Sequence, residues 1–423
     1  MNAASRPLHV AIAGFGTVGR AVARALTGGH HPALRLSAVG TRRPDAVRRN
    51  APWIPAGVQV TGDIDALLES GADVCVELMG GAEPARTWIA AALQSGRAVV
   101  TANKQVVAEY GPELFSLARA CGSPLRFEAA VAGAVPVIRG LQDGLAGDRV
   151  TRIAGVVNGT CNYVLGRMTD EGLSLDEAVR EAQARGFAEA DPASDLDGLD
   201  ARAKLAILAS IGFGDHLPPR GIYAGSIRSI DAGDIAAAAG IGRVIRQVAW
   251  AGRSVPEGGI AAGVSAALVC RHSWLGRAQG PENVVVVQGE RSGTTVFAGQ
   301  GAGGDATAVA VLSDLLTLAG QRSLPLPWPA SPARPSSGDD ARPHYVRVSR
   351  AGIGQSYRPA CLLEGAGIEI DQVLALAGDA SERWAAIARP CRRADLDRAL
   401  GPILPAGGDD GAVISLPLFD AET

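Results

Sequence analysis

The sequence has little of what binds nucleic acid or crosses a membrane. Aromatic side chains make up 4% of its 423 residues and the formal net charge is −3, so no basic stripe with interleaved aromatics is available for nucleic acid. No apolar run approaches the roughly 20 residues that a transmembrane helix needs. We therefore expect neither a nucleic-acid partner nor a membrane partner.

Cysteines are few and scattered. None of the six stands in a CxxC pair, so we expect neither a zinc site nor a disulfide framework, and the thiols fit a reducing, cytoplasmic location. Cys161 lies inside a polar motif, and we interpret it as a buried bystander. The N-terminus runs almost at once into an apolar strand pattern, so we also expect no signal peptide.

Lysine is scarcer still. Of the 40 basic residues only Lys104 and Lys204 are lysines, and the remaining 38 are arginines. Arginine does not deprotonate at useful pH, whereas the pKa of a lysine can be lowered enough for proton transfer. A chain that uses arginine nearly everywhere but keeps lysine at two positions indicates that both amines have a chemical role.

The first third of the chain alternates short apolar runs with helical patterns. A chain of this length exceeds the roughly 250–300 residues that one core supports, so we expect two or three domains. Strand–helix alternation predicts an α/β fold with a parallel, doubly wound sheet of the Rossmann type. The expected strands are Leu8–Gly14, Leu34–Gly40, Asp73–Leu78 and Arg97–Ala102, and the expected helices are Thr17–Leu26 and Glu83–Gln94.

The pattern changes near Pro136, where long helical segments begin to mix with β-like runs, and this predicts a second, α+β domain. The helical segments are Leu175–Arg185 and Asp200–Ser210, and the β-like runs are Glu282–Glu290 and Arg291–Gly299. A segment rich in proline, serine and charge at 323–343 is typical of a linker. Beyond it, residues 344–419 fit a small βαββαβ unit.

The motif GFGTVG stands directly between an expected strand and an expected helix. Its glycines permit a tight turn and close backbone approach, and the helix N-terminus attracts a pyrophosphate. A purely structural glycine turn is the alternative. The predicted cofactor residues are Gly14, Phe15, Gly16, Thr17, Val18 and Gly19.

The residues after the second expected strand select the nucleotide. NAD-binding domains tend to place an acid there, whereas this chain has Arg42 and Arg43 and no acid before Asp45. Arginines favour a 2′-phosphate, so we expect NADP(H) to be preferred, with NAD(H) as the other cofactor. The alternative is two solvated surface arginines.

Five acids fall within twelve residues: Glu189, Asp191, Asp195, Asp197 and Asp200. Pro192 separates an extended, acid-bearing segment from a helix expected to begin near Asp197 or Asp200. Asp200 and Lys204 are then i,i+4 neighbours, a spacing that is most often a surface salt bridge. Lys104 changes this interpretation, because it follows the end of a strand where doubly wound sheets bind ligands.

Several separate motifs carry a family resemblance. They are GFGTVG at Gly14, TANK at Thr101–Lys104, FEAAVAGAVP at Phe127–Pro136, GVVNGTCNYVL at Gly155–Leu165, GFAEADPASDLDGLDARAKLAIL at Gly186–Leu208 and GAGGDATAVAVLSD at Gly301–Asp314. Together they resemble homoserine dehydrogenase over roughly residues 8–320. That resemblance implies reversible NAD(P)H-dependent reduction of L-aspartate 4-semialdehyde to L-homoserine, in threonine, methionine and isoleucine biosynthesis.

The resemblance also implies roles for single residues. Glu189 would bind the substrate amino group, Asp195 and Asp200 would help position it, and Lys204 would donate a proton to the developing alkoxide. Lys104 would lie between nicotinamide and substrate and polarise the carbonyl. Asn158 and Thr160 are expected to be polar groups that fix the loop and lie on the substrate side, and Thr101 and Gly303 are expected near the cofactor. Asp191 and Asp197 are expected to be turn or cap residues.

FEAAVAGAVP resembles the family's monovalent cation site, where a glutamate and backbone carbonyls hold a sodium ion. The expected ligands are Glu128, Val131, Gly133 and Val135. Oxygen-only ligation suits a hard cation. Ala132 and Ala134 depart from the family's more glycine-rich loop, but carbonyl ligands do not depend on side chains.

With the resemblance, the chain divides into parts by function. We expect a nucleotide-binding domain at 1–135, to which a helix at 305–322 returns, a catalytic and dimerisation domain at 136–304, and an ACT-like module at 344–423. ACT domains commonly sense threonine or support oligomerisation. The usual acid–Pro–Gly turn is missing and Arg350 stands near its place, so we describe the module as degenerate. The family suggests a homodimer or homotetramer.

Two other functions stay open. One is a different oxidoreductase on the same scaffold, acting on another amino-acid semialdehyde or an amino dicarboxylate; the absence of a cysteine in a nucleophile setting disfavours the phosphorylating kind. The other is an inactive, nucleotide-sensing regulatory protein. The presence of Lys104, Glu189, Asp200 and Lys204 speaks against it.

Overall fold

The chain divides into two compact units. In the computed structural model, residues 6–253, 259–320, 341–349, 359–374, 383–403 and 413–419 are described. The first unit comprises residues 1–149, 203–219 and 297–333, and the second comprises 150–202, 220–296 and 334–423. The division by function predicted from the sequence stays a prediction, because compactness alone does not assign a function. Within the described residues, no helix is long and apolar enough to span a membrane.

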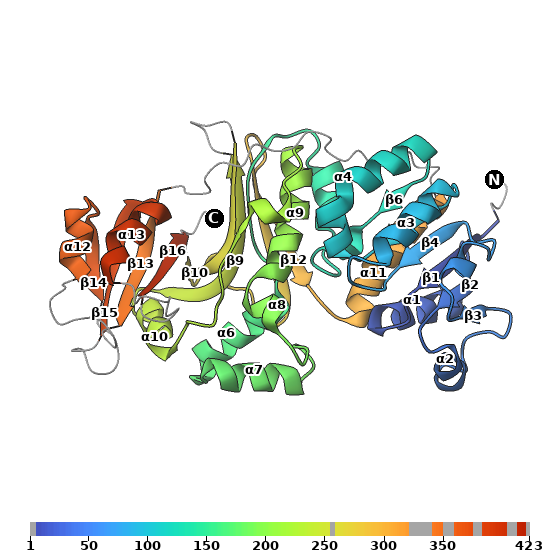
Figure 1. The fold of residues 1–423 in the computed structure, drawn as a ribbon, viewed down its shortest axis with the longest axis horizontal. Coiled ribbons are helices and arrows are strands. Elements are labelled where there is room, and N and C mark those ends of the chain that lie inside the picture. Colours follow the sequence, from blue (N-terminus) through green and yellow to red (C-terminus); the bar gives the residue numbers. More distant parts are fainter. Residues whose placement is uncertain are drawn as a thin grey trace. The chain divides into compact units, whose positions relative to one another are not determined.

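The first unit is built on a six-stranded parallel sheet (Figure 1). Its order, β3-β2-β1-β4-β5-β6, is that of a Rossmann domain with the switch point between β1 and β4, so the predicted fold class is confirmed. Residues Val10–Ala13 are fully buried, as expected for a strand covered on both faces. The strands are β1 (Leu8–Ala13), β2 (Leu34–Gly40), β3 (Gln59–Thr61), β4 (Val74–Glu77), β5 (Ala98–Thr101) and β6 (Leu125–Arg126).

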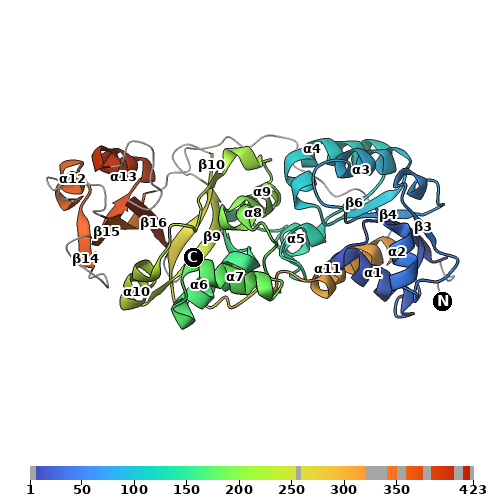
Figure 2. The same cartoon turned by 60° about the horizontal axis from the view of Figure 1, so that its bottom comes forward.

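Helices cover both faces of this sheet. In Figure 2, α1 and α11 lie on one face and α3 and α4 on the other. α11 comes from far along the chain and packs against α1, where the sequence predicted a returning helix at 305–322. The helices are α1 (Thr17–Thr27), α2 (Pro44–Asn50), α3 (Ala85–Gln94), α4 (Lys104–Cys121), α5 (Val137–Arg139) and α11 (Gly304–Gly320).

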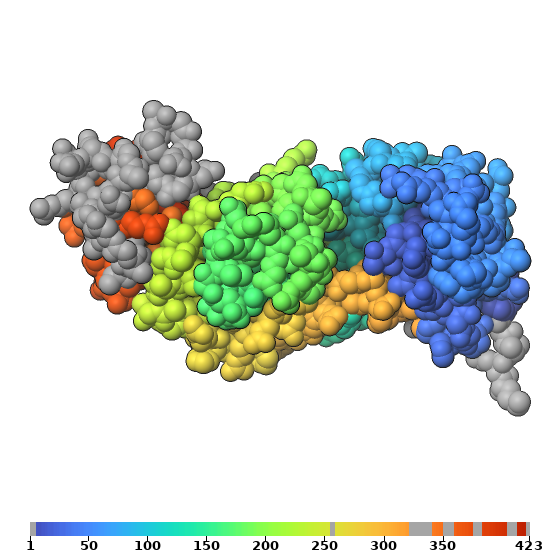
Figure 3. Space-filling model, turned by 90° about the horizontal axis from the view of Figure 1, so that it is seen from below, coloured from blue at the N-terminus to red at the C-terminus, as the bar shows by residue number. Residues whose placement is uncertain are grey.

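The second unit is built on a mixed sheet in the order β12-β11-β7-β9-β10, continued by C-terminal strands. The strands are β7 (Val150–Val156), β8 (Tyr223–Ala224, paired with β10), β9 (Arg243–Arg253), β10 (Ile260–Cys270), β11 (Glu282–Gly289) and β12 (Gly293–Gln300). The helices are α6 (Gly159–Glu171), α7 (Leu175–Ala184), α8 (Ala193–Leu196) and α10 (Ala232–Gly240). A further helix, α9 (Leu199–Phe213), begins in this unit and continues into the first unit from residue 203. α7 lies at the surface, green in Figure 3, and buries Ala178 and Ala182.

The C-terminal segment has a βαββαβ pattern with strand order β16-β13-β15-β14. β16 pairs with β10 through Leu268↔Leu418 and Val269↔Phe419, so these strands extend the sheet of the second unit. Its assignment as an ACT-like module stays a prediction. Arg350 and most of the predicted linker lie outside the described residues. The elements are β13 (Arg342–Ser349), α12 (Pro359–Gly365), β14 (Ile370–Leu374), β15 (Arg383–Cys391), α13 (Arg393–Leu400) and β16 (Val413–Phe419).

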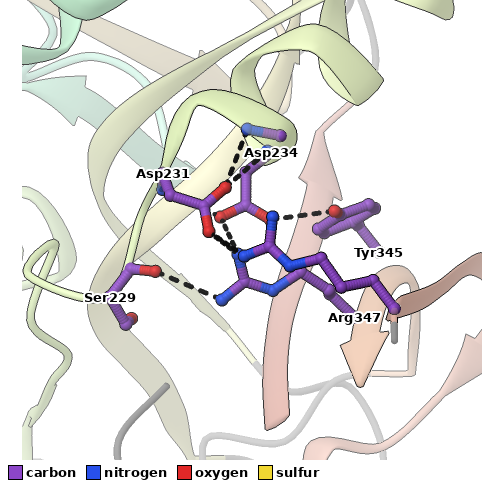
Figure 4. A network of polar contacts seen from close by, with 7 residues as sticks. Ser229, Asp231, Asp234, Tyr345 and Arg347 are labelled. Atoms are coloured by element: carbon purple, nitrogen blue, oxygen red, sulfur yellow. Dashed lines mark hydrogen bonds and ion pairs between the residues drawn. The ribbon is translucent and has the colours of Figure 1, made fainter. Parts of the chain in front are cut away.

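A buried ion-pair network fastens this segment to α10 (Figure 4). The guanidinium of Arg347, on β13, donates at 2.9 Å to Asp234, which is fully buried, and also pairs with Asp231, the N-cap of α10. The Tyr345 hydroxyl donates to Asp234 at 2.9 Å. Burial raises the pKa of Asp234, and the charge of Arg347 opposes that rise. The network therefore joins β13 to α10 within the second unit.

Candidate active site

The glycine motif makes the turn from β1 into α1. Gly14 has φ +107°, and a Cβ there would lie 2.4 Å from the carbonyl oxygen of Leu78. A Cβ on Gly19 would lie 2.1 Å from the carbonyl oxygen of Gly14. Gly16 is the N-cap of α1, makes no side-chain capping bond and faces open space. The motif thus leaves the N-terminus of α1 accessible to an anionic group.

A cavity of about 1080 Å³ lies over this turn within the first unit. Five of the predicted cofactor residues line it: Gly14, Phe15, Gly16, Arg42 and Arg43. Arg42 and Arg43 are exposed and follow the end of β2. The space runs from the phosphate-binding turn to the two arginines and fits a dinucleotide.

The other predicted cofactor residues lie beside this turn. Thr17, Val18 and Gly19 form the first turn of α1. Gly303, with φ +119°, precedes α11, and a Cβ on the next residue, Gly304, would lie 2.8 Å from Cγ2 of Thr17. The second glycine loop therefore packs against the start of α1.

Lys104 is the first residue of α4 and is half-buried. Asn103 caps this helix, because its side-chain oxygen accepts the N–H of Val106 at 3.2 Å. Thr101, at the end of β5, is fully buried and its hydroxyl donates to Glu77 at 2.6 Å. Lys104 is thus placed at the carboxyl end of the sheet by a capped helix start.

Three of the predicted substrate residues meet in the second unit. Asn158 caps α6, accepting the N–H of Cys161 at 2.8 Å, while its side-chain amide donates to Asp195 at 2.7 Å and to Asp200 at 2.9 Å. Asp200 is buried and Asp195 is half-buried. One amide therefore holds two carboxylates side by side, on the segment that leads into α9. Lys204 lies one turn further along this helix.

The rest of the acidic stretch is arranged around this cluster. Glu189 is exposed on the loop between α7 and α8. Thr160 supports that loop, because its hydroxyl donates to the carbonyl of Phe187 at 2.7 Å. Asp191 accepts the N–H of Ala193 in a turn. Asp197 pairs with the guanidinium of Arg228 at 2.9 Å, which lowers the pKa of Asp197.

Some supporting residues were missed by the sequence-based analysis. Gln247, on β9, and Cys161 both donate to the backbone carbonyl of Asp195, each at 3.1 Å. Cys161 is buried, as the sequence suggested, but its thiol also helps to fix the backbone of Asp195. Gln247 lies on a strand that also carries Arg243, Arg246 and Arg253, so no pattern in the sequence singled it out.

The predicted cation loop is tightly folded. Ala132 and Gly133 both have left-handed backbone, with φ 58° and 57°, and a Cβ on Gly133 would lie 2.7 Å from the backbone of Gly301. The Glu128 carboxylate accepts the N–H groups of Ile138 and Arg139 at 3.0 and 2.9 Å. Burial, and then the nearby carboxylate of Asp314, raise the pKa of Glu128 to about 7.

Comparison with known proteins assigns the chain to a family. A family model described as homoserine dehydrogenase matches residues 136–316, and one described as homoserine dehydrogenase, NAD binding domain, matches residues 14–128. The chain is 41% identical to homoserine dehydrogenase of Synechocystis sp. over 321 residues, which covers 74% of this chain and 73% of that protein. The chain belongs to the homoserine dehydrogenase family. It is also 41% identical to homoserine dehydrogenase of Mycobacterium tuberculosis over 325 residues, or 75% of this chain and 74% of that protein.

Solved homoserine dehydrogenases share the fold. The enzyme from Thiobacillus denitrificans gives a TM-score of 0.86 at 30% identity, covering 98% of this chain and 99% of that chain. A hyperthermophilic archaeal homoserine dehydrogenase in complex with NADPH gives a TM-score of 0.64 at 28% identity, covering 76% of this chain and 100% of that chain. As a homoserine dehydrogenase, the chain is an NAD(P)-dependent oxidoreductase that interconverts L-homoserine and L-aspartate 4-semialdehyde. This decides against the two other functions left open by the sequence.

Proposed function

We propose that Glu189 binds the substrate α-ammonium, that Asp195 and Asp200 position it, and that Lys204 transfers the proton. The observation that supports this is the Asn158 amide, which holds Asp195 and Asp200 together at 2.7 and 2.9 Å. An ammonium group requires carboxylates, and α9 carries Lys204 one turn after Asp200.

In this proposal the two lysines act on the substrate oxygen. The nicotinamide, when bound, takes the hydride from homoserine or returns it. Lys204 accepts the hydroxyl proton in the oxidative direction and donates it in the reductive direction. Lys104, fixed at the start of α4, stabilises the charge that develops on the same oxygen.

Substitution of Glu189 tests the substrate site. We expect Glu189→Gln to raise the Michaelis constant for homoserine about tenfold or more, the loss of roughly one charge-assisted hydrogen bond, with a smaller effect on kcat. Asp176→Asn, which removes an exposed charge on α7, is the matched control. Equal effects of the two substitutions would contradict the role of Glu189.

We infer that NADP(H) is preferred over NAD(H). Support comes from Arg42 and Arg43, which line the nucleotide cavity beyond β2, where a guanidinium can pair with a 2′-phosphate. Replacing both with leucine should raise the Michaelis constant for NADP⁺ about tenfold more than that for NAD⁺. Arg49→Leu, on the short helix α2 that begins just after Arg43 but outside the cavity lining, is the control. Equal changes for the two cofactors would contradict the preference.

We further propose a sodium ion at the loop of Glu128, held by its carboxylate and by the carbonyls of Val131, Gly133 and Val135. Two buried carboxylates support the proposal, because Glu128 lies beside Asp314, and the nearby positive charges are the guanidinium groups of Arg139, which is partly exposed, and Arg126. A monovalent cation with oxygen ligands would favour the ionised form of Glu128.

The C-terminal segment is proposed to be a degenerate ACT-like module in a cytoplasmic homodimer or homotetramer. Its βαββαβ pattern supports this proposal. If the module senses threonine, millimolar threonine should inhibit turnover or shift the assembly state. No response in either assay would contradict sensing and leave a role in assembly.

A further inference from the structure

Glu77 is a fully buried carboxylate in the middle of the nucleotide-binding sheet. It ends β4, where it pairs with Ala13 of β1 on one side and with Thr101 of β5 on the other. The first of these strands leads into the glycine turn and the second leads into Lys104. Glu77 therefore lies between the strand that leads into the cofactor-binding turn and the strand that leads into Lys104.

Its two oxygens contact both sides. One accepts the Thr101 hydroxyl at 2.6 Å, and the other accepts the N–H of Met79 at 2.7 Å. The Thr101 oxygen in turn accepts the N–H of Asn103 at 3.0 Å, and the Asn103 side chain donates to the carbonyl of Gly81 at 2.7 Å. These bonds close a network between the loop after β4 and the loop after β5.

Each end of the network reaches a functional element. Asn103 caps α4, which begins at Lys104, and Met79 lines the nucleotide cavity. A buried carboxylate is costly unless it is hydrogen-bonded, and burial raises the pKa of Glu77. The preceding strand residues, Val74 and Val76, are apolar and buried, so packing of the sheet does not call for an acid here.

We propose that Glu77 is a positioning residue of the reaction: through Thr101 and Asn103 it fixes the start of α4 and hence Lys104, and through Met79 it fixes the wall of the cofactor cavity. The proposal rests on the proposed role of Lys104. Asn103 also joins the two loops, through its bond to Gly81, but Glu77 bonds to each of them with a separate carboxylate oxygen.

Isosteric substitutions test this proposal. Thr101→Val removes the hydroxyl on the Lys104 side only, so we expect kcat for homoserine oxidation to fall about tenfold or more while the dissociation constant for NADPH changes little. Glu77→Gln should change both quantities. Because Glu77 and Thr101 act through one hydrogen bond, kcat of the double variant should be at most about twofold lower than kcat of Glu77→Gln. Thr101→Ser, which restores the hydroxyl, should recover most of the lost kcat.

Asp234→Asn is the matched control, since Asp234 is also a fully buried carboxylate but lies in the network of α10. Suppose that Thr101→Val and Glu77→Gln lower thermal stability as Asp234→Asn does, but keep kcat within about twofold of the unsubstituted enzyme. That result would overturn the proposal in favour of a purely structural role. Additive effects in the double variant would also overturn it. If Glu77→Gln does not fold, Thr101→Val and Thr101→Ser still decide. Full kcat in Lys104→Met would contradict the role of Lys104 itself, which is a separate failure.

Discussion

The two lysines, in a chain with 38 arginines, lie at positions where an amine could transfer a proton or stabilise a negative charge. Lys104 begins α4 at the carboxyl end of the nucleotide-binding sheet, and Lys204 lies on α9 one turn after Asp200. Both are half-buried, so neither is an ordinary solvated surface amine. These positions support our proposal that Lys204 transfers the proton and that Lys104 stabilises the developing charge.

Replacing Lys204 with arginine separates proton transfer from positive charge. Arginine keeps the charge and a high helix propensity but does not release a proton. We expect kcat for homoserine oxidation to fall about 100-fold or more, within the range that a positioned acid–base group contributes. NADPH binding, followed by nicotinamide fluorescence, should persist. A kcat within about threefold of the unsubstituted enzyme would contradict proton transfer by Lys204.

Glu128 predicts a pH-dependent stability. Its pKa is raised from 4.5 to about 7, so between these two pH values the folded protein keeps a proton on Glu128 that the unfolded chain has already released. The free energy of unfolding should therefore fall as pH rises from about 4.5 through 7. The charged groups near Glu128 are the carboxylate of Asp314 and the guanidinium of Arg139, and the guanidinium of Arg126 lies near Asp314. In Glu128→Gln this fall should be smaller.

The measurement is urea unfolding at about pH 5.5 and pH 8, in sodium chloride and in choline chloride of equal ionic strength. A bound cation favours the ionised carboxylate, so sodium should restore stability at the higher pH in the unsubstituted protein only. If the unsubstituted protein and Glu128→Gln respond alike to pH and to sodium, both the raised pKa and the cation site are wrong.

At the scale of elements, the start of α6 organises the acidic segment. Asn158 caps this helix with its oxygen and holds Asp195 and Asp200 with its nitrogen. Two further donors, from Cys161 and Gln247, fix the Asp195 carbonyl. The carboxylates are thus placed by α6 and β9, not by the acidic segment alone.

Substitutions that keep the cap test this arrangement. Serine and aspartate both serve as N-caps, so α6 should persist in Asn158→Ser and Asn158→Asp. We expect Asn158→Ser to raise the Michaelis constant for homoserine about tenfold, because the carboxylates lose their shared donor. Asn158→Asp should be worse, because it adds a third negative charge. Equal Michaelis constants in the two variants would contradict the cluster.

The sequence predicted the long elements well and the cluster poorly. β1, β2, β4 and β5 are recognisable as buried apolar runs, and α1 and α7 have a clear helical period, whereas the short strands β3 and β6 were not predicted. α8 has four residues and no detectable period, so we expected a helix only from near Asp197 or Asp200, whereas Asp195 lies on a short helix of its own. The partners of Asn158 stand 37 and 42 residues further along the chain, and no local pattern reports such contacts.

At the scale of the whole chain, the C-terminal segment is part of the sheet of the second unit. β16 pairs with β10, and Arg347 reaches the buried carboxylate of Asp234. An effector that moved β13 would act directly on α10. A removable regulatory attachment would show neither the shared sheet nor the buried ion pair.

Arg347→Met tests this attachment. The substitution leaves Asp234 buried without its guanidinium partner, so we expect a loss of about 3–5 kcal/mol in the free energy of unfolding, measured in urea. Adding Asp234→Asn should recover part of the loss, because the buried charge is gone. A loss below about 1 kcal/mol would mean that the network does not hold the segment.

The most direct test of the account is absorbance at the nicotinamide wavelength, with purified protein, L-homoserine and NADP⁺, in parallel with NAD⁺ and with Lys204→Ala. We expect homoserine-dependent reduction that is faster with NADP⁺ and is nearly abolished in the variant. Undiminished turnover in Lys204→Ala, with the variant folded and binding NADPH, would contradict the assignment of the proton to Lys204.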